Sequence, residues 1–256
     1  MVMNGNMNKI LHGKETKTMS AIRCSHSGDF GDLIYSLPLV KVLGGGRYVL
    51  KTKLKPPTIR EVMTGAKAIS LMTLLSQQSY ITGVDFDPDD TIIATHDLDE
   101  FREYLKPGRS LAQAYFKMYN LDDSILQFPW LTCESKMVAP VVFNRTLRYR
   151  NEQFPWKKLY TAHKHEAVFV GTDAEHIDFQ NHFGKIPYYH TPTLADLAAV
   201  INGSIHFIGN QSAALAIALG LYKRATVEVW PERPDCCLPR LNVEYILESP
   251  SFYLME

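Results

Sequence analysis

The chain has 256 residues, a length that can form one large domain or two small ones. Its 27 Lys and Arg residues balance 27 Asp and Glu residues, so the formal net charge is zero. This balance argues against a surface that coats nucleic acid or membranes in general, although it leaves room for a local basic patch. No apolar run is long enough to span a bilayer.

The chain divides into a leader and two folded parts. Residues 1–19 are polar and Lys-rich and lack the apolar core of a signal peptide, so we expect a disordered leader. Strand and helix patterns then alternate in two successive runs, which are separated by residues 128–136. We therefore predict two α/β domains with Rossmann-like parallel sheets, over residues 20–135 and 136–256. The cysteines lack metal-ligand spacing, which favours a reduced chain in the cytoplasm.

In the first domain the pattern opens as a β-α-β unit. Residues 21–25 read as a strand, residues 33–43 as a helix with Pro38 inside it, and residues 47–54 as a second strand. We expect the proline to bend or loosen the helix, and the glycines at 44–46 to end it. Later helices are expected at 58–63, 68–77, 97–104 and 111–119, and later strands at 80–86 and 91–95.

In the second domain strands and helices alternate as far as residue 230. Strands are expected at 139–144, 166–171, 186–189, 205–208 and 225–230, whereas residues 232–256 are Pro-rich and show little periodicity before 243–247. Helices are expected at 156–163, 174–183, 194–201 and 213–219. This order again predicts a parallel sheet, whose ligands bind beyond the carboxyl ends of the strands.

The stretch FIGNQSAALAIALG, residues 207–220, predicts an anion site. A buried strand leads through a polar turn into an alanine-rich helix, which directs backbone N–H groups and the positive end of the helix dipole at a ligand. Gly209 would let the backbone turn, and Asn210, Gln211 and Ser212 would add side-chain groups. The alternative is an ordinary strand-to-helix junction in which Ser212 is the N-cap.

The first glycine turn, HSGDFGD at residues 26–32, places Gly31 and Asp32 where a helix begins. Asp32 could be an N-cap or first-turn acid that stabilises the helix dipole. It could also be a carboxylate at the edge of a cleft, able to accept a proton from a hydroxyl group. Because both glycine turns follow strands, we expect them to meet across a cleft between the two domains.

The loop VFNRTLRYRNEQFPW, residues 142–156, carries three arginines just past a strand end. Arg145, Arg148 and Arg150 could clamp a phosphate or carboxylate with paired N–H donors, or could belong to a solvated basic loop. Further candidates at the same sheet edge are Gly171, Thr172 and Glu228; the last could bind sugar hydroxyls or be a surface acid. Phosphate-loop, nucleophile-elbow and zinc-protease motifs are absent from the sequence.

Three segments together resemble the ADP-heptose:lipopolysaccharide heptosyltransferase family, which has the GT-B glycosyltransferase fold. They are GDLIYSLPLVKVL at 31–43, VVFNRTLRYRNEQFPWKKL at 141–159 and LADLAAVINGSIHFIGNQSAALAIALG at 194–220. They follow the family's order and are distributed between residues 31 and 220. The resemblance implies two Rossmann-like domains that face a cleft, an acceptor-side domain first and a nucleotide-sugar domain second.

The resemblance also implies roles for individual residues. Asp32 matches the general base, Gly31 allows its close approach, and Arg148 or Arg150 matches the cation near the donor phosphates. The diphosphate turn would be formed by Asn210, Gln211 and Ser212. The implied activity is metal-independent transfer of a sugar from a nucleotide diphosphate sugar to a hydroxyl acceptor, with no other cofactor.

The sequence departs from the family in ways that keep other functions open. The chain is short, Asn-Gln-Ser replaces the usual Asp-Ser-Gly, and Leu215 lies near the position of a common histidine. A non-catalytic protein that binds or sequesters a nucleotide or nucleotide sugar is one alternative. Another is transfer onto DNA bases, which would require a basic face such as the one that could be formed by Lys51, Lys53, Lys55 and Arg60.

Overall fold

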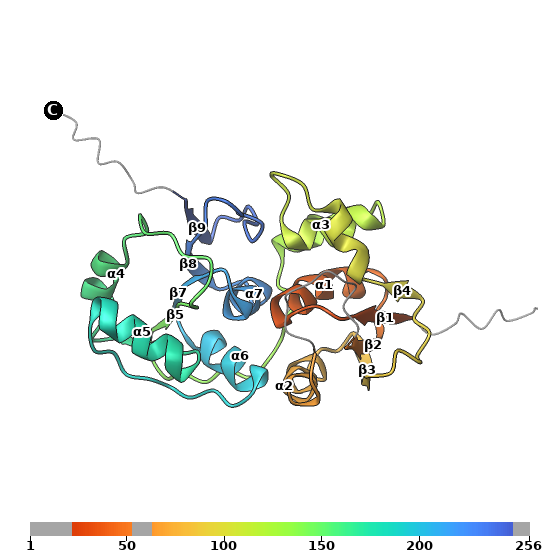
Figure 1. Ribbon diagram of the computed structural model, residues 1–256, viewed down its shortest axis with the longest axis horizontal. Helices are drawn as coiled ribbons and strands as arrows, with labels where there is room; N and C mark the ends of the chain where they lie inside the picture. The colour runs from red at the N-terminus through yellow and green to blue at the C-terminus, as the bar shows by residue number, and fades with distance from the viewer. Residues whose placement is uncertain (1–21, 53–62, 248–256) are drawn as a thin grey trace, which may run out of the picture.

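The computed structural model describes residues 22–52 and 63–247 (Figure 1). The expected leader at 1–19 and all but the last residue of the expected helix at 58–63 lie outside the described residues. The described part contains two all-parallel sheets with their helices, so the predicted α/β class with two Rossmann-like sheets is confirmed. The sheets lie on either side of the boundary predicted after residue 135, which itself stays a prediction.

The first sheet has four strands in the order β3-β2-β1-β4. Its strands are Arg23–His26 (β1), Gly46–Lys51 (β2), Ile81–Asp87 (β3) and His96–Asp97 (β4). Its helices are Phe30–Val42 (α1), Gly65–Leu75 (α2) and Leu111–Met118 (α3), with short 3-10 helices at Asp99–Tyr104 (η1) and Ser124–Gln127 (η2). Strand β1 lies inside the sheet, between β2 and β4. Because α1 follows β1 directly, α1 begins at the carboxyl edge of this sheet.

The second sheet has five strands in the order β6-β5-β7-β8-β9. Its strands are Val141–Asn144 (β5), Ala167–Phe169 (β6), His206–Asn210 (β7), Arg224–Glu228 (β8) and Val243–Ile246 (β9). Its helices are Trp156–His163 (α4), Asp173–Phe183 (α5), Leu194–Gly203 (α6) and Ala213–Gly220 (α7). Helices α5 and α6 begin with capping boxes, as does α3, so the sequence marks their first residues.

Alternate residues of β5 face two different cores. Val142 packs into the larger core with α6 and α7, whereas Val141 and Phe143 pack with Trp156 and Phe179 from α4 and α5. This alternation is what a strand covered by helices on both faces requires. The larger core is continuous with the residues around α1 and α2, so the two sheets share one hydrophobic core.

Helix α7 lies at the centre of this shared core, next to α1 (Figure 1). Residues 214–220 are all buried, as expected for a helix that is apolar on every side. Its alanines keep it thin, and a methyl group added to Gly31 would lie only 4.0 Å from the backbone of Ala213. The beginnings of α1 and α7 therefore touch. The expected bend at Pro38 is not tested, because the structure shows only that α1 continues through it.

Two expected strands differ from the structure. Residues 91–95 form no strand, because the Asp87 carboxylate accepts hydrogen bonds from the backbone N–H groups of Thr91 and Ile92. The strand β4 begins instead at His96 and pairs with β1. Residues 186–189 contribute only one bridge, between Phe169 and Tyr188, since Pro187 has no N–H group to extend a ladder.

The segment that joins the two halves is held against the second sheet's helices. The N–H groups of Trp130 and Leu131 donate to the carbonyl oxygen of Gly220, and that of Lys136 donates to Ala199. The side chain of Arg240 reaches back to the carbonyl oxygens of Leu126 and Leu219. The connection is thus tightly bonded along its length. Within the described residues, no helix is both long and apolar enough to cross a membrane.

The structure also corrects the reason for a glycine at position 209. Gly209 lies inside strand β7 rather than in the turn, and a Cβ there would come within 2.7 Å of the carbonyl oxygen of Asn144. We expect Gly209→Ala to lower the free energy of unfolding by about 1–3 kcal/mol in urea titrations, because β5 must move away. Gly65→Ala is the control, since its Cβ would meet nothing closer than 3.8 Å. Equal stability of the two variants would contradict this role.

Candidate functional site

A pocket opens where the carboxyl ends of strands from both sheets meet. Its volume is about 580 Å³, including space open to solvent. Its wall combines the first turn of α1, the start of α3, the loop after β5, the start of α7 and the loop after β8. Asp32 and Ser212 both line it. The expectation that the two glycine turns share one crevice is therefore confirmed.

Asp32 is not the N-cap of α1 but its third residue. The N-cap is Asp29, whose side chain makes no capping hydrogen bond and whose carboxylate also lines the pocket. The Asp32 carboxylate is almost buried and forms an ion pair with Arg102 at 2.5 Å. Arg102 lies on η1, so a residue 70 positions along the chain orients the acid. The sequence around residue 102 contains no signal of this role.

A buried polar chain supports the turn before Asp32. The His26 ring contacts the Tyr115 hydroxyl at 2.6 Å, and that hydroxyl donates to the carbonyl oxygen of Asp32 at 3.0 Å. On the other side, Asp99 accepts hydrogen bonds from the N–H and hydroxyl of Ser27. Burial raises the pKa of Asp99, but contacts from His26 and Ser27 outweigh it and lower the pKa to about 2.

Ser212 is the N-cap of α7, as the alternative interpretation of this turn expected. Its hydroxyl oxygen accepts from the N–H of Leu215 at 3.2 Å, and its hydroxyl donates to Asn144 at 2.8 Å. The N–H groups of Ala213 and Ala214 have no acceptor within the helix, as in any first helical turn. With Ala213 lining the pocket, they give it the positive end of a helix dipole.

The side chains of Asn210 and Gln211 support loops of the site. Asn210 accepts from the N–H of Thr146 at 2.9 Å and donates to the carbonyl oxygen of Arg148 at 2.7 Å, which fixes the loop after β5. Gln211 accepts from the N–H of Trp230 at 2.8 Å and donates to the carbonyl oxygen of Arg233 at 2.8 Å, which fixes the loop after β8. Only Gln211 of the two lines the pocket.

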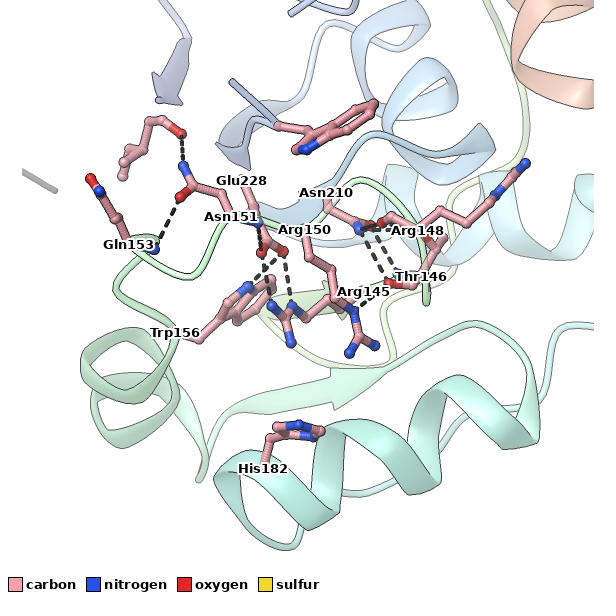
Figure 2. A network of polar contacts seen from close by, with 12 residues as sticks. Arg145, Thr146, Arg148, Arg150, Asn151, Gln153, Trp156, His182, Asn210 and Glu228 are labelled. Carbon is pink, nitrogen blue, oxygen red and sulfur yellow. Dashed lines mark hydrogen bonds and ion pairs between the residues drawn. The ribbon is translucent and has the colours of Figure 1, made fainter. Parts of the chain in front are cut away.

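Arg145 and Glu228 lie outside the pocket and bind each other. Two nitrogens of Arg145 donate to the two oxygens of Glu228, each at 2.9 Å, and both side chains are buried (Figure 2). Trp156 and the N–H of Asn151 donate to the same carboxylate at 2.8 Å. This satisfied network holds the loop after β5 to β8. Both side chains are thus bonded within the protein and away from the pocket, which does not support the expected phosphate clamp or sugar-hydroxyl contact at these two residues.

The remaining two arginines of the loop differ. Arg150 donates to the carboxylate of Asp178 on α5 and to the carbonyl oxygen of Thr146, away from the pocket. Arg148 lines the pocket and extends away from the network (Figure 2). Among the described residues, its exposed guanidinium group has no hydrogen-bond or ion-pair partner and lies 5.4 Å from the ring centroid of Tyr149. Of the predicted arginines, Arg148 alone is placed to meet a ligand there.

Gly171 and Thr172 form a separate helix start. Thr172 is the N-cap of α5, where its capping box with Glu175 uses its hydroxyl group. Gly171 has φ 144°, and a Cβ there would come within 2.7 Å of Glu175. Neither residue lines the pocket. Their positions fit a capped strand-to-helix junction rather than the site described above.

Sequence reasoning missed other residues of the wall, namely Tyr35, Leu111, Tyr149, Arg233, Asp235 and Cys236. Tyr35 follows Asp32 by one helical turn, so helical spacing could have found it. Its buried hydroxyl group has no partner among the described residues, and burial raises its pKa well above the usual value. For the residues of the loop after β8, the sequence offered one signal, which is that the loop follows a predicted strand.

Three further expectations concern the basic face, a metal site and the cysteines. Of the proposed basic face, Lys53, Lys55 and Arg60 lie outside the described residues, and Lys51 forms an ion pair with Asp90 at 2.7 Å. No set of three or more acidic, His or Cys side chains gathers as a metal site in the described segments. All four cysteines are free, and a cytoplasmic location stays a prediction.

No protein-family model and no curated protein matches the sequence. Solved structures do match the fold. A glycosyl transferase family 9 structure from Veillonella parvula DSM 2008 has a TM-score of 0.58 at 11% identity, covering 88% of this chain and 86% of that one. The iron-containing dodecameric glycosyltransferase TibC from enterotoxigenic E. coli H10407 has a TM-score of 0.51 at 13% identity, covering 87% and 61%. A heptosyltransferase TibC complex with ADP-D-beta-D-heptose has a TM-score of 0.52. The expected GT-B-like fold is confirmed.

The support under Asp32 predicts an acid-sensitive contribution to stability. Because the pKa of Asp99 is lowered to about 2 by folding, its ionised form favours the folded state above about pH 4, and this is lost as pH falls toward 2. We expect urea titrations to show the wild type losing on the order of 2 kcal/mol more than Asp99→Asn between about pH 5 and pH 2. If the free energies of unfolding of the wild type and Asp99→Asn changed in parallel with pH, Asp99 would not be the source of this acid sensitivity.

The buried pair predicts a large structural effect. Glu228→Gln leaves Arg145 without its compensating charge, so we expect the free energy of unfolding in urea to fall by about 3–5 kcal/mol. The double variant Arg145→Met with Glu228→Gln should recover most of this loss, because it removes both charges and keeps an oxygen that accepts from Trp156 and from the N–H of Asn151. Arg148→Met is the control and should stay within about 0.5 kcal/mol of wild type. A Glu228→Gln protein as stable as wild type would contradict the structural role.

Proposed function

We propose that the protein is a glycosyltransferase that moves a sugar from a nucleotide diphosphate sugar to a hydroxyl acceptor. The observation that carries this proposal is the single pocket in which Asp32, Arg148 and the start of α7 come together. These groups supply the two things that the reaction needs, a proton acceptor and a site for a diphosphate leaving group. The fold likeness to glycosyl transferase family 9 supports the same reaction class.

In this proposal the donor diphosphate binds at the start of α7. The N–H groups of Ala213 and Ala214 donate to phosphate oxygens, and the guanidinium of Arg148 adds a positive charge from the loop after β5. Because the helix amides are fixed before the reaction, they stabilise the charge that develops as the bond from sugar to phosphate breaks, and Arg148 adds to this. The complex of TibC with ADP-D-beta-D-heptose supports a nucleotide sugar as the class of donor. No metal ion or other cofactor is required in this scheme.

Asp32 acts on the other substrate. As the acceptor oxygen attacks the sugar carbon, its proton passes to the Asp32 carboxylate, and the nucleoside diphosphate leaves with the bonding electrons. The ion pair with Arg102 holds this carboxylate in one orientation. Gly31 supports the role by its lack of a side chain, since it lies against the first residue of α7. Acceptor and donor would thus meet at the contact between the two helices.

A nucleotide-binding protein without catalytic activity is the second candidate. The observation that favours it is the use of Asn210 and Gln211 as loop supports, which leaves fewer groups for a donor than the sequence pattern suggested. The two candidates differ in whether Asp32 is needed. A thermal-shift screen with nucleotides and nucleotide sugars identifies the best ligand, because bound ligand stabilises the folded state in proportion to occupancy.

The replacement Asp32→Asn tests the proposal. We expect release of nucleoside diphosphate from the best donor, measured in a coupled assay with donor in excess, to fall by about 10²-fold or more. The dissociation constant of the nucleoside diphosphate should change by no more than about threefold, since the phosphate groups bind elsewhere. Asn keeps the shape of the side chain, so the variant should still fold.

Asp85→Asn is the matched control, because Asp85 also pairs with an arginine, Arg47, but lies on β3 outside the pocket. It should leave the rate of nucleoside diphosphate release unchanged. Normal turnover by Asp32→Asn would show that another group is the base. Tight nucleotide binding by the wild type, with no turnover of any donor, would favour the non-catalytic candidate.

A further inference from the structure

The loop after β5 is fixed on both sides of one aromatic residue, Tyr149. Before it, the side chain of Asn210 donates to the carbonyl oxygen of Arg148 at 2.7 Å. After it, the N–H of Asn151 donates to Glu228 at 2.8 Å, and Asn151 itself donates to the carbonyl oxygen of Leu247 at 2.7 Å. Figure 2 shows these anchors and the buried Arg145–Glu228 pair beside them. The backbone at residue 149 therefore has little freedom.

Tyr149 adopts a backbone conformation that favours glycine, with φ 54°. A side chain in this left-handed region is strained, and such residues concentrate where a precise side-chain position is used. The ring of Tyr149 is half-buried in the pocket wall and packs against the ring of Trp230, with 5.5 Å between centroids and 41° between planes. The guanidinium of Arg148 lies 5.4 Å from its centroid. Three flat groups thus lie together at this side of the pocket.

We propose that Tyr149, supported by Trp230, is the platform on which the nucleobase of the donor stacks. This inference rests on the proposed function, which puts the diphosphate at the start of α7 and beside Arg148. The base of a nucleotide lies one ribose away from its phosphates, so it must meet a neighbouring part of the wall. Aromatic rings bind any base through its flat face, and an adjacent arginine adds a cation–π contribution.

The rest of the described wall offers no second exposed aromatic ring. Tyr35 is the other aromatic residue of the described lining, and it is only 3% exposed, so its ring has no free face. Leu111 and Ala213 are too small or too narrow to cover a base. Trp130 and Trp156 are buried in the core. Tyr149 is the half-exposed ring that also lies next to the phosphate-binding groups.

The test compares ligands with and without a base. The full chain is titrated with ADP, UDP and inorganic pyrophosphate by isothermal calorimetry, as wild type, Tyr149→Gly and Tyr149→Phe. Glycine accepts φ 54° without strain, so Tyr149→Gly removes the ring while favouring the same backbone. Tyr222→Gly is the matched control, because Tyr222 also has a positive φ, 59°, and an arginine at its ring, but lies beyond the other end of α7.

We expect Tyr149→Gly to weaken the better nucleoside diphosphate by about tenfold or more and pyrophosphate by less than about twofold. Tyr149→Phe and Tyr222→Gly should bind both as wild type does. Equal weakening of both ligands, or of neither, would overturn the stacking role. If the wild type binds pyrophosphate but gains nothing from a base, only this inference fails; if it binds none of the three, the proposed function fails as well.

Discussion

The close contact between α1 and α7 is the constraint on which the rest of the structure depends. Two helices with ordinary side chains pack with their axes 8–10 Å apart. Here Gly31 meets the backbone of Ala213, and the alanines of α7 keep that helix thin. The first turns of helices from two different sheets therefore line one pocket. A methyl group at position 31 would just reach van der Waals contact with α7, at 4.0 Å, so a longer side chain directed at α7 from that position would separate the acid of the first sheet from the amides of the second.

Around this contact, polar side chains divide into those that build the pocket and those that face it. Asn210 and the Arg145–Glu228 pair are buried and hydrogen-bonded to protein groups, and they fix the loop after β5. Buried polar groups must find such partners, since an unmet one is costly. This rigidity explains the positions of Arg148 and Tyr149. Because the loop is anchored on both sides, its exposed middle can hold the Arg148 guanidinium and can keep the backbone of Tyr149 in a strained conformation.

The sequence predicted the parts of this arrangement that are local. Strand, turn and helix around Ser212 follow from periodicity and capping, and their shared edge follows from the rule for parallel sheets. It could not predict pairings between distant residues, such as Arg102 with Asp32 or Glu228 with Arg145. Those depend on the register of strands and on which loops meet. Residues 91–95 have strand propensity, yet the Asp87 carboxylate accepts hydrogen bonds from the N–H groups of Thr91 and Ile92, which a β-ladder would need.

The same division explains why residue type alone could not assign the three arginines of the loop after β5. A guanidinium after a strand end serves a ligand or a buried carboxylate equally well, and the burial of the neighbouring strand decides which. Strand β8 ends in the buried Glu228, whose charge requires a partner in the protein, and Arg145 is the arginine nearest to that strand end. After Arg145 the chain turns outward. Arg148 lies at the pocket, whereas Arg150 extends to α5, where it donates to Asp178. One buried acid therefore determines which of the three arginines lines the pocket.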